Sequence, residues 1–551
     1  MALRYPRAGP RFMRRTAALL ATLALVVVSG AAARPYAPAT SKASAAGQPT
    51  FVVTGRGWGH GVGMSQWGAY GYASRGWTYD QIVGHYFPGT ELGPAPVARV
   101  RVLLAEGRGS VKIGSALPFG VRDASGQRTE LEAKAYAFGP GLRVLAGRAP
   151  LAGPLLFLPS GTEPLTLDGR RYRGQLEVTV VAGKLRVVNV VGLEAYLAGV
   201  VPDEVPSAWP SEALKAQAVV ARSYALASRR SGPYDLYADT RSQVYGGVAS
   251  EEATTTAAIG ETAGQVVLFG GKVAQTFFFS TSGGRTASAE DTWSGESIPY
   301  LVSVPDPYDD ASPHHRWGPV AYTAPALAKR LGVKGTVVDM RMTVNPSQRV
   351  DAVTVVTSTG EATLTGGDVR TKLGLRSTWF RVGVLALQRP ARPIVVGGRV
   401  TLAGASRGIT SVLEAKPTGG TWGVVGAVKP AAGGVVATSV KPTISTEYRL
   451  ASGTVRTPPV RVLVAPGVKL AAPTAPTALS GTVKPVVGTT AVAIQRRDDA
   501  GAWHTVATAT PQASGAFTAE LALSPGTYRA RYAPGRGFAV GLSPVLEVRP
   551  A

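Results

Sequence analysis

The chain lacks cysteine altogether, and this absence excludes several kinds of site across its 551 residues. Disulfide scaffolds, zinc sites built from thiolates and thiol nucleophiles all require cysteine. Acidic residues are also scarce, because 34 Asp and Glu stand against 58 Lys and Arg and give a formal net charge of +24. This imbalance predicts anionic partners without identifying them.

Long apolar runs are missing after the first 33 residues, whereas a membrane-spanning helix needs about 20 apolar residues. Residues 1–33 are typical of a cleaved export signal, with five arginines, a largely apolar run at 16–29 and small residues at 31–33. We therefore expect a secreted protein, with an uncleaved N-terminal membrane anchor as the alternative. Cleavage lowers the net charge to +19. For an exported chain we expect anionic envelope polymers or lipid headgroups as partners, and no nucleic acid.

The composition of the mature chain changes along its length. Residues 34–50 are rich in Ala, Pro and Ser and predict a linker. Residues 51–390 carry the aromatic, Glu, Gln and His motifs, and after them short Val, Thr and Ala runs are separated by Gly and Pro. We expect an α+β fold: a β-rich catalytic-type domain at 51–390 with a few packed helices, followed by two all-β immunoglobulin-like sandwich modules at 391–465 and 479–551.

An internal repeat supports the two modules. Trp422 aligns with Trp503 and Tyr448 aligns with Tyr528, which gives a period near 80 residues, and residues 465–478 predict a linker between the modules. This tail holds 17 basic and 6 acidic residues, a net charge of +11, against +8 for the longer segment 34–390. Anionic wall polymers are therefore candidate ligands of the basic tail. A surface that only improves solubility explains the charge equally well.

Within residues 51–390, strand-like runs outnumber helices. One long helix is predicted at 212–229, where Leu214 and three alanines fall on one face at three- and four-residue spacing. Six runs have the alternating or β-branched composition of strands, at 99–105, 176–181, 185–191, 266–269, 274–280 and 350–357.

The first stretch that suggests chemistry is residues 55–71, GRGWGHGVGMSQWGAYG. Glycine at every second position from 55 to 63 costs backbone entropy and requires a reason, such as close approach to a ligand or unusual torsions. The spacing fits neither a P-loop nor a dinucleotide fingerprint. Aromatic rings beside His60, Ser65 and Gln66 are typical of sugar binding; the alternative is a tight glycine-rich turn with core aromatics. The rings are those of Trp58, Trp67, Tyr70 and Tyr72.

The second stretch is residues 191–226. It predicts a short helix at 192–201 that breaks at Pro202, then a non-helical turn that contains Glu204, then the long helix. A carboxyl on a rigid turn beside Val205 and Trp209 can have a raised pKa suited to general-acid catalysis. A solvated surface carboxylate is the alternative.

Both stretches resemble the signature motifs of the stage II sporulation protein D family, also called the amidase-enhancer family. The family's Glu-Met/Val-Pro motif is present at 204–206, its E-A-L-K-A-Q-A-V-x-A-R-[ST]-Y motif at 212–224, and its G-x-G-x-G-H-G-x-G-M-S-Q motif from residue 55. Shorter matches lie at 193–197, 239–245, 279–284 and 376–380. The resemblance covers roughly residues 51–385 and excludes the tail.

The sequence departs from the family pattern in two ways. The Gly-His-Gly motif usually follows the Ser-Thr-Trp-Phe strand, whereas here it opens the domain, which suggests a circular permutation and predicts that 51–54 and 379–385 are neighbours. Some relatives bind zinc through Cys and His, so with no cysteine that site is absent or rebuilt. His314 and His315 lie near three aspartates, but we expect no metal and no cofactor.

The resemblance implies a lytic transglycosylase that cleaves peptidoglycan between N-acetylmuramic acid and N-acetylglucosamine. Glu204 is then the single acid and base, because the attacking group is the C6 hydroxyl of the muramyl sugar itself. Glu194 and Glu212 are competing acids. Candidate substrate-binding residues carried over from the motifs are His60, Ser65, Gln66, Lys215, Gln217, Arg222, Ser282 and Gly283. Of these, Lys215, Gln217 and Arg222 are equally candidates for a structural role.

Two other functions remain open from the sequence. The family name also records non-catalytic enhancement of an amidase, which would make the protein a wall-binding partner of a cell-wall amidase. A purely structural adhesin built on the two sandwiches is the third alternative. It leaves the motifs at 55–71 and 191–226 unexplained.

Overall fold

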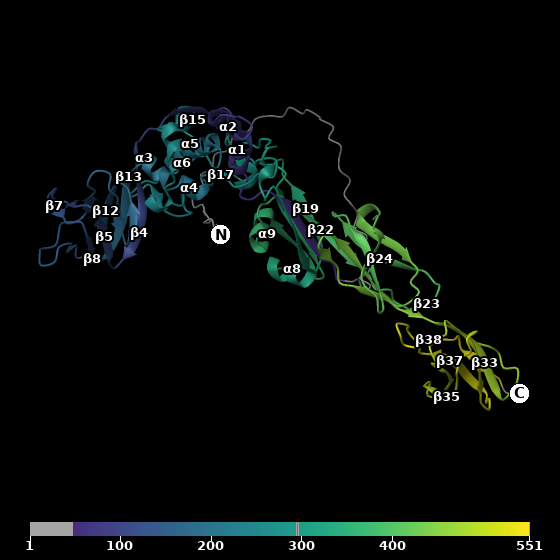
Figure 1. Ribbon diagram of the computed structural model, residues 1–551. Coiled ribbons are helices and arrows are strands. Elements are labelled where there is room, and N and C mark those ends of the chain that lie inside the picture. The colour runs from purple at the N-terminus through teal and green to yellow at the C-terminus, as the bar shows by residue number, and fades with distance from the viewer. Residues whose placement is uncertain (1–47, 294, 296, 550–551) are drawn as a thin grey trace, which may run out of the picture.

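The computed structural model describes residues 48–293, 295 and 297–549; the predicted export signal and most of the first linker lie outside this range. The chain is mostly β, with many antiparallel sheets and few helices. Its parts follow one another in an elongated arch, from a β unit through a helical unit to the tail modules (Figure 1). No helix within the described residues is long and apolar enough to cross a bilayer.

The β unit at one end of the arch packs two sheets around one core. A seven-stranded sheet has the order β14-β4-β13-β12-β9-β6-β7, and a four-stranded sheet has the order β11-β10-β5-β8. Its strands are β4 (Arg99–Arg108), β5 (Val111–Ser115), β6 (Phe119–Arg122), β7 (Arg128–Leu131), β8 (Ala135–Phe138), β9 (Leu155–Leu158), β10 (Leu165–Leu167), β11 (Arg170–Tyr172), β12 (Gln175–Val181), β13 (Lys184–Gly192) and β14 (Leu236–Tyr237). The predicted strands at 99–105, 176–181 and 185–191 are confirmed as parts of β4, β12 and β13.

A helical unit follows, with α5 (Ser211–Ala227) at its centre. The predicted face of Leu214 and the alanines packs into the core of the β unit, while Ala216, Val219 and Val220 pack into a second core. The long helix is thus confirmed, and it is buried on two sides. The other helices are α1 (Gln66–Ala73), α2 (Tyr79–Tyr86), α3 (Leu193–Ala198), α4 (Val201–Glu204), α6 (Ala253–Glu261) and α7 (Ala289–Trp293).

Short strands complete the helical unit: β2 (Met64–Ser65), β3 (Glu91–Pro94), β15 (Gln265–Phe269), β16 (Lys272–Val273) and β17 (Phe278–Phe279). The predicted strand at 266–269 is confirmed by β15. The predicted strand at 274–280 is wrong over most of its length, because only residues 278–279 of it form β17, whose partner is the two-residue strand β2.

The third unit carries a strand pair that is distant in sequence. β1 (Thr50–Arg56) lies antiparallel to β22 (Phe380–Leu387), with Phe51 opposite Val384. The prediction that 51–54 and 379–385 are neighbours is therefore confirmed, while a circular permutation stays a prediction. The unit's other elements are β18 (Arg316–Thr323), α8 (Ala324–Leu331), β19 (Val337–Val344), β20 (Val350–Thr357), β21 (Gly360–Thr365) and α9 (Gly366–Leu373). The predicted strand at 350–357 is β20.

The sheet that contains β1 and β22 continues past residue 390 into the tail, in the order β18-β1-β22-β24-β27. Phe51 and Val384 face the core formed with α8 and α9, whereas Val52 and Leu385 face the core of the first tail module. Because both faces are covered, β22 is apolar over nearly its whole length. The first tail module (residues 391–465) therefore shares a sheet with the preceding unit.

Each tail module packs two sheets around its own core. Strands of the first tail module are β23 (Ile394–Val395), β24 (Val400–Arg407), β25 (Val412–Pro417), β26 (Gly423–Ala427), β27 (Val435–Val440), β28 (Thr446–Ser452), β29 (Val455–Arg456), β30 (Val460–Val462) and β31 (Val464–Ala465). Those of the second tail module are β32 (Gly467–Leu470), β33 (Ala478–Lys484), β34 (Val492–Arg497), β35 (Trp503–Ala509), β36 (Ala516–Glu520), β37 (Gly526–Tyr532), β38 (Gly541–Leu542) and β39 (Leu546–Val548). β32 lies inside the segment predicted as a linker. An immunoglobulin-like topology stays a prediction.

The glycines at 57, 59, 61 and 63 all have positive φ, between +72° and +122°. They let residues 57–65 run directly beside residues 277–287. The backbone N–H of Trp58 donates to Thr281 O at 2.8 Å, and that of Met64 donates to Phe277 O at 3.0 Å. A Cβ at Gly63 would lie 2.1 Å from Phe277 O. The close approach that the glycines permit is thus to the protein's own backbone.

We predict that Gly63→Ala destabilises the fold far more than Gly76→Ala. Both glycines have positive φ, but a Cβ at Gly76 meets no atom within 4 Å. We expect a loss of about 1 kcal/mol for Gly76→Ala from torsional strain alone, and of about 3–5 kcal/mol for Gly63→Ala from strain plus backbone clash. Denaturant unfolding of the full chain measures both. Equal losses would contradict the close packing of 57–65 against 277–287.

Candidate functional site

Glu204 is the last residue of α4, a single helical turn. The prediction that a helix at 192–201 breaks at Pro202 is wrong. α3 ends at Ala198, and Pro202 lies within the first turn of α4, where a proline costs no hydrogen bond. The prediction of a non-helical turn at Glu204 is also wrong. The chain leaves α4 at Val205, which is buried and anchors the end of this turn.

The carboxyl of Glu204 is half-buried and has no cation within ion-pair distance among the described residues. Burial, together with the neighbouring Asp203 carboxylate, raises the pKa of Glu204 to about 7, against the opposing effect of a hydrogen bond from Gln66. Gln66 Nε2 also donates to the backbone O of Glu204 at 3.2 Å. Gln66 from the glycine-rich stretch and Glu204 from the second stretch therefore meet.

Three aromatic rings gather beside this contact. The ring centroids of Trp67 and Trp209 are 5.1 Å apart, those of Tyr70 and Trp209 are 5.2 Å apart, and those of Trp67 and Tyr70 are 5.4 Å apart. All three rings are half-buried, so part of their surface faces solvent. We call Trp67, Tyr70 and Trp209 the aromatic trio. Two rings of the first stretch lie elsewhere, because Tyr72 is in the core and Trp58 packs edge-on against His314.

His60 is held by the glycine-rich segment itself. Its Nδ1 accepts the N–H of Val62 at 3.1 Å, so its Nε2 carries the proton and donates to Phe278 O at 3.1 Å. Burial and the charge of Arg370 lower the pKa of His60 to about 4, which keeps the ring neutral at physiological pH. The structure therefore gives His60 a part in holding residues 57–65 against β17.

Ser65, Ser282 and Gly283 belong to a buried polar network next to the site. The Ser65 Oγ accepts from Gly68 N at 3.1 Å and caps α1. Ser282 Oγ donates to Asp309 Oδ2 at 3.0 Å, and the N–H of Gly283 donates to the same oxygen at 2.5 Å. These contacts fix residues 279–284 in place. All three are buried, whereas the rings of the aromatic trio are partly exposed.

The sequence alone assigns no structural role to Asp306 and Asp309, two aspartates that accept hydrogen bonds within this network. Asp306 accepts from Tyr86 Oη at 2.9 Å, and burial together with the nearby Asp309 raises the pKa of Asp306 to about 7. Asp309 also pairs with His315 Nδ1 at 2.7 Å. Within the described part of the chain, no three His, Asp or Glu side chains converge on a metal site. The histidine–aspartate contact is a hydrogen-bonded pair within this buried network.

The three polar residues taken from α5 differ in their surroundings. Arg222 is fully buried and donates to Glu194 through Nε at 3.1 Å, and to Gln265 O at 3.0 Å. Lys215 bridges Glu212 at 2.8 Å and Glu261 at 2.6 Å. Both competing acids, Glu194 and Glu212, are therefore neutralised by cations, unlike Glu204.

Gln217 is the third of these residues. It is 1% exposed, and neither its amide nitrogen nor its amide oxygen has a hydrogen-bond partner among the residues that the structure describes. It lies seven residues before Tyr224 and so on the same face of α5. Tyr224 is close enough to Glu204 for that carboxylate to raise the pKa of its phenol, after burial has done so. Unsatisfied buried amides are rare and costly, so Gln217 is an unexplained polar group in the core beneath this face of α5.

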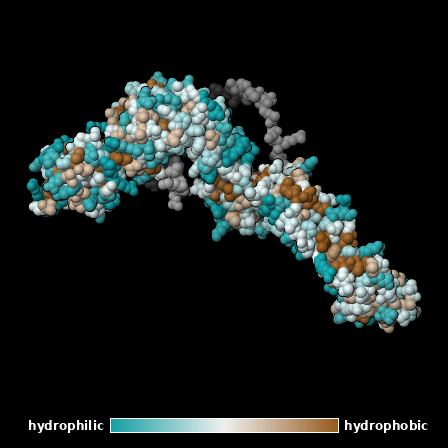
Figure 2. All heavy atoms as spheres, viewed as in Figure 1, coloured by the Kyte–Doolittle hydropathy of each residue, from teal (hydrophilic) through white to brown (hydrophobic). Residues whose placement is uncertain are grey.

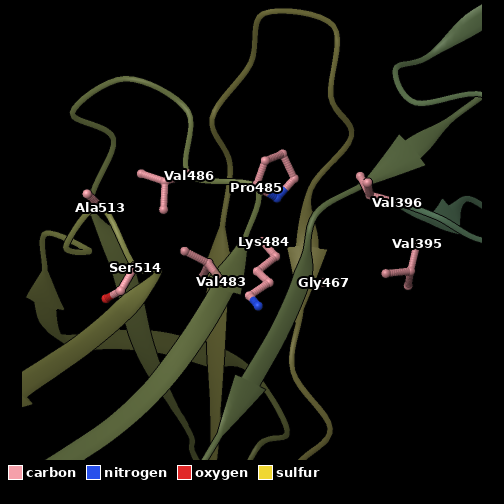
Figure 3. A pocket seen from close by; sticks show the side chains of 9 residues that line it. All are labelled: Val395, Val396, Gly467, Val483, Lys484, Pro485, Val486, Ala513 and Ser514. Atoms are coloured by element: carbon pink, nitrogen blue, oxygen red, sulfur yellow. The ribbon is translucent and has the colours of Figure 1, made fainter.

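Two hollows of the surface do not include Glu204 in their lining. One of about 510 Å³ sits between the tail modules and is lined by apolar groups around Lys484 and Pro485 (Figure 3). Apolar surface gathers near β24 and β23 (Figure 2). A second hollow, of about 440 Å³, lies beside Glu194 and Gly264. Neither brings several titratable groups together, so the candidate site remains Glu204 with the aromatic trio.

Known proteins with similar sequences include members of the family that the motifs resemble. Residues 181–269 match the family model described as Stage II sporulation protein. Stage II sporulation protein D of Bacillus subtilis (strain 168) is 33% identical over 213 residues, 35% of this chain and 61% of that protein. An uncharacterized protein of Brachyspira hyodysenteriae is 39% identical over 143 residues, 25% of this chain and 39% of that protein. The amidase enhancer of Bacillus subtilis is 36% identical over 152 residues, 27% of this chain and 21% of that protein.

The chain thus spans about three fifths or less of the length of these relatives. A crystal structure of Rst D1-D2 covers 30% of this chain and 97% of its own at 18% identity, with a TM-score of 0.16, too low to inform the fold. The sequence matches define the class of this part of the chain as that of the sporulation and amidase-enhancer proteins. The chain contains a domain of the stage II sporulation protein D and amidase-enhancer family, matched over residues 181–269.

We predict that Arg222→Ala destabilises the protein more than Lys215→Ala. Removing Arg222 leaves the Glu194 carboxylate and two backbone carbonyls without their buried donor, which costs about 2–4 kcal/mol. The Lys215 bridges are nearer the surface and are worth about 1 kcal/mol or less. Thermal unfolding of both variants measures the difference. An Arg222→Ala protein with wild-type stability but weakened glycan binding would instead assign Arg222 to the substrate.

Proposed function

We propose that the protein is exported, acts at the cell wall and is a lytic transglycosylase. It cleaves glycan strands between N-acetylmuramic acid and N-acetylglucosamine and leaves 1,6-anhydro ends. The observation that supports this most is the Glu204 carboxyl, which has a pKa raised to about 7 by burial, no cation partner among the described residues and a partly exposed aromatic trio beside it. With this pKa, the Glu204 carboxyl can donate a proton and then accept one near neutral pH.

The reaction needs one carboxyl. The protonated Glu204 gives its proton to the glycosidic oxygen as the bond from the muramyl anomeric carbon breaks. The C6 hydroxyl of the same muramyl residue attacks that carbon, and its proton returns to the Glu204 carboxylate. A bond forms from C6 oxygen to the anomeric carbon, no water is consumed, and the carboxyl ends protonated. Hydrolytic glycosidases need a second carboxylate because water or the enzyme must supply the nucleophile.

The neighbouring groups support this assignment. Gln66 holds the end of α4 through the backbone O of Glu204, so the carboxyl stays at the junction of the two stretches. The aromatic trio offers rings of the kind that cover the apolar face of a pyranose. Glu194 and Glu212 are held by Arg222 and Lys215 and are poorly placed to exchange protons with a substrate.

A second function follows from the 36% identity with the amidase enhancer. In that case the same site binds glycan without cleaving it and presents a cell-wall amidase to its substrate. The two functions differ in one product. A transglycosylase alone releases 1,6-anhydro ends from purified strands, whereas an enhancer changes the products only when the amidase is added.

We predict that Glu204→Gln abolishes formation of 1,6-anhydro ends, a loss of at least about 10²–10⁴-fold. The amide keeps the shape and removes the proton, so glycan binding should persist. Asp203→Asn is the matched control, because Asp203 is exposed and its carboxylate accepts only from Ser250 Oγ at 2.8 Å in the described structure. At pH 6 this control should retain activity. Mass spectrometry of products from strands without stem peptides measures both.

If Glu204→Gln released anhydro products at the wild-type rate, Glu204 would not be the acid. If the wild-type protein released none but stimulated an added amidase, the enhancer function would replace the transglycosylase. The fold is checked at pH 8. The pKa of Glu204 is higher in the folded protein than in the unfolded chain, so the stability that its protonation contributes is lost as the pH rises from about 4.5 through 7. At pH 8 this contribution is gone, and Glu204→Gln should therefore melt no lower than the wild type.

We predict that the rate falls above about pH 7 with the slope of a single proton. The first step requires the protonated carboxyl, and the second uses the carboxylate that the first step creates, so Glu204 sets only the alkaline limb. Because Asp203 raises the pKa of Glu204, Asp203→Asn should move this limb to lower pH. Rates of anhydro-end formation from pH 5 to 9 test this. If the alkaline limb of the pH–rate profile did not move in Asp203→Asn, that limb would report the titration of a group other than Glu204.

A further inference from the structure

Each tail module contains a sheet with the same arrangement of strands. β25 lies between β26 and β28 in the first tail module, and β34 lies between β35 and β37 in the second. Each central strand carries a register shift toward its first neighbour, immediately before Glu414 in β25 and immediately before Gln495 in β34. Glu414 and Gln495 therefore occupy equivalent positions.

Each sheet also carries the same stacked pair of side chains. The Arg449 guanidinium lies 3.8 Å from the ring centroid of Trp422, and that of Arg529 lies 4.0 Å from that of Trp503. The Nε of each arginine donates to the central strand, to Glu414 Oε2 at 2.7 Å in the first module and to Gln495 Oε1 at 2.9 Å in the second.

The modules differ in the charge that faces the arginine. In the first tail module Glu414 also accepts from Arg456 Nε at 3.0 Å, so one carboxylate serves two guanidinium groups. In the second tail module the neutral Gln495 stands in its place.

A second arginine, Arg531, lies beside Arg529 on the same strand of the second tail module. Arg531 lies two residues along the same strand and therefore on the same face of the sheet. Neither Arg529 nor Arg531 has a carboxylate within ion-pair distance among the described residues. An acid that lies on this face, Glu547, accepts instead from Thr527 Oγ1 at 2.7 Å.

Two close guanidinium groups without a counter-ion repel each other. The pKa of Arg529 is lowered by burial and then by the charge of Arg531. Nε of Arg529 is used by Gln495, and no described residue accepts from its two terminal nitrogens. These nitrogens form the edge that binds a carboxylate or phosphate through two parallel hydrogen bonds.

We propose that Arg529 and Arg531, held by Trp503 and Gln495, form an anion-binding site for the charged groups of an anionic wall polymer. In the first tail module Glu414 supplies this anion internally. In the second tail module the anion comes from a phosphodiester or a sugar carboxylate of the ligand. The tail's excess of basic residues, 17 against 6 acidic, attracts such a chain over a longer range.

The site is tested on the full chain with three soluble polymers of similar length, poly(glycerol phosphate), polyglucuronate and a neutral dextran. We expect one polymer-binding site in the second module, for the phosphate polymer, the uronate polymer or both, and no binding of dextran. Arg529→Gln and Arg531→Gln should each weaken binding roughly tenfold. Arg449→Gln is the matched control and should leave binding unchanged, because its partner is already Glu414.

The reciprocal exchange separates a site from general basic charge. Gln495→Glu should weaken binding about as much as Arg529→Gln, and Glu414→Gln should add a weaker second site, with melting curves confirming that both variants fold. Equal weakening by Arg449→Gln and Arg529→Gln would overturn the proposal, and so would binding unchanged in Gln495→Glu. Binding confined to anionic lipid vesicles would also overturn it. None of these outcomes depends on whether Glu204 is catalytic.

Discussion

The contact of residues 57–65 with residues 277–287 determines where the site forms. The chain reaches this arrangement through glycines at positive φ that bring two backbones within direct hydrogen-bonding distance. At its end Ser65 caps α1, and Gln66 reaches the backbone O of Glu204. His60 serves the same packing through its two ring nitrogens. The glycine-rich stretch therefore supplies the scaffold, and its last residues supply the site.

Charge pairing then distinguishes one carboxyl from its neighbours. Arg222 neutralises Glu194 inside the protein, and Lys215 neutralises Glu212 near the surface. Glu204 is desolvated without such a partner, so its protonated form is favoured near neutral pH. A helix that places two cations on two acids, and leaves the third to burial alone, establishes the acid–base difference that a one-carboxyl mechanism requires.

The sequence predicts local features well, but of the long-range contacts it predicts only that 51–54 and 379–385 are neighbours. The alanine face of α5 and the alternation in β4, β12, β13 and β20 depend on neighbours in sequence, and the structure has them within a few residues. The sequence predicts the helix break at Pro202, whereas the structure has Pro202 in the first turn of α4, where proline is tolerated. The roles of Asp306 and Asp309 depend on partners more than 20 residues away, Tyr86 and Ser282, which no spacing in the sequence reveals. The apolar composition of β22 fits its burial on both faces, but no spacing in the sequence identifies its second partner, β24.

The sheet shared by the third unit and the first tail module connects the tail to the candidate site. β22 pairs with β1 on one side and with β24 of the first tail module on the other, so no flexible linker separates that module from the strand that leads into residues 57–65. β31 and β32 then join the two modules with a single residue between them, Pro466. Few bonds along this path are free to rotate, so an anion held at the proposed site of Arg529 and Arg531 would restrict the orientation of the whole arch relative to the polymer. On the proposed function, this restricted orientation would determine which glycan strands come within reach of Glu204.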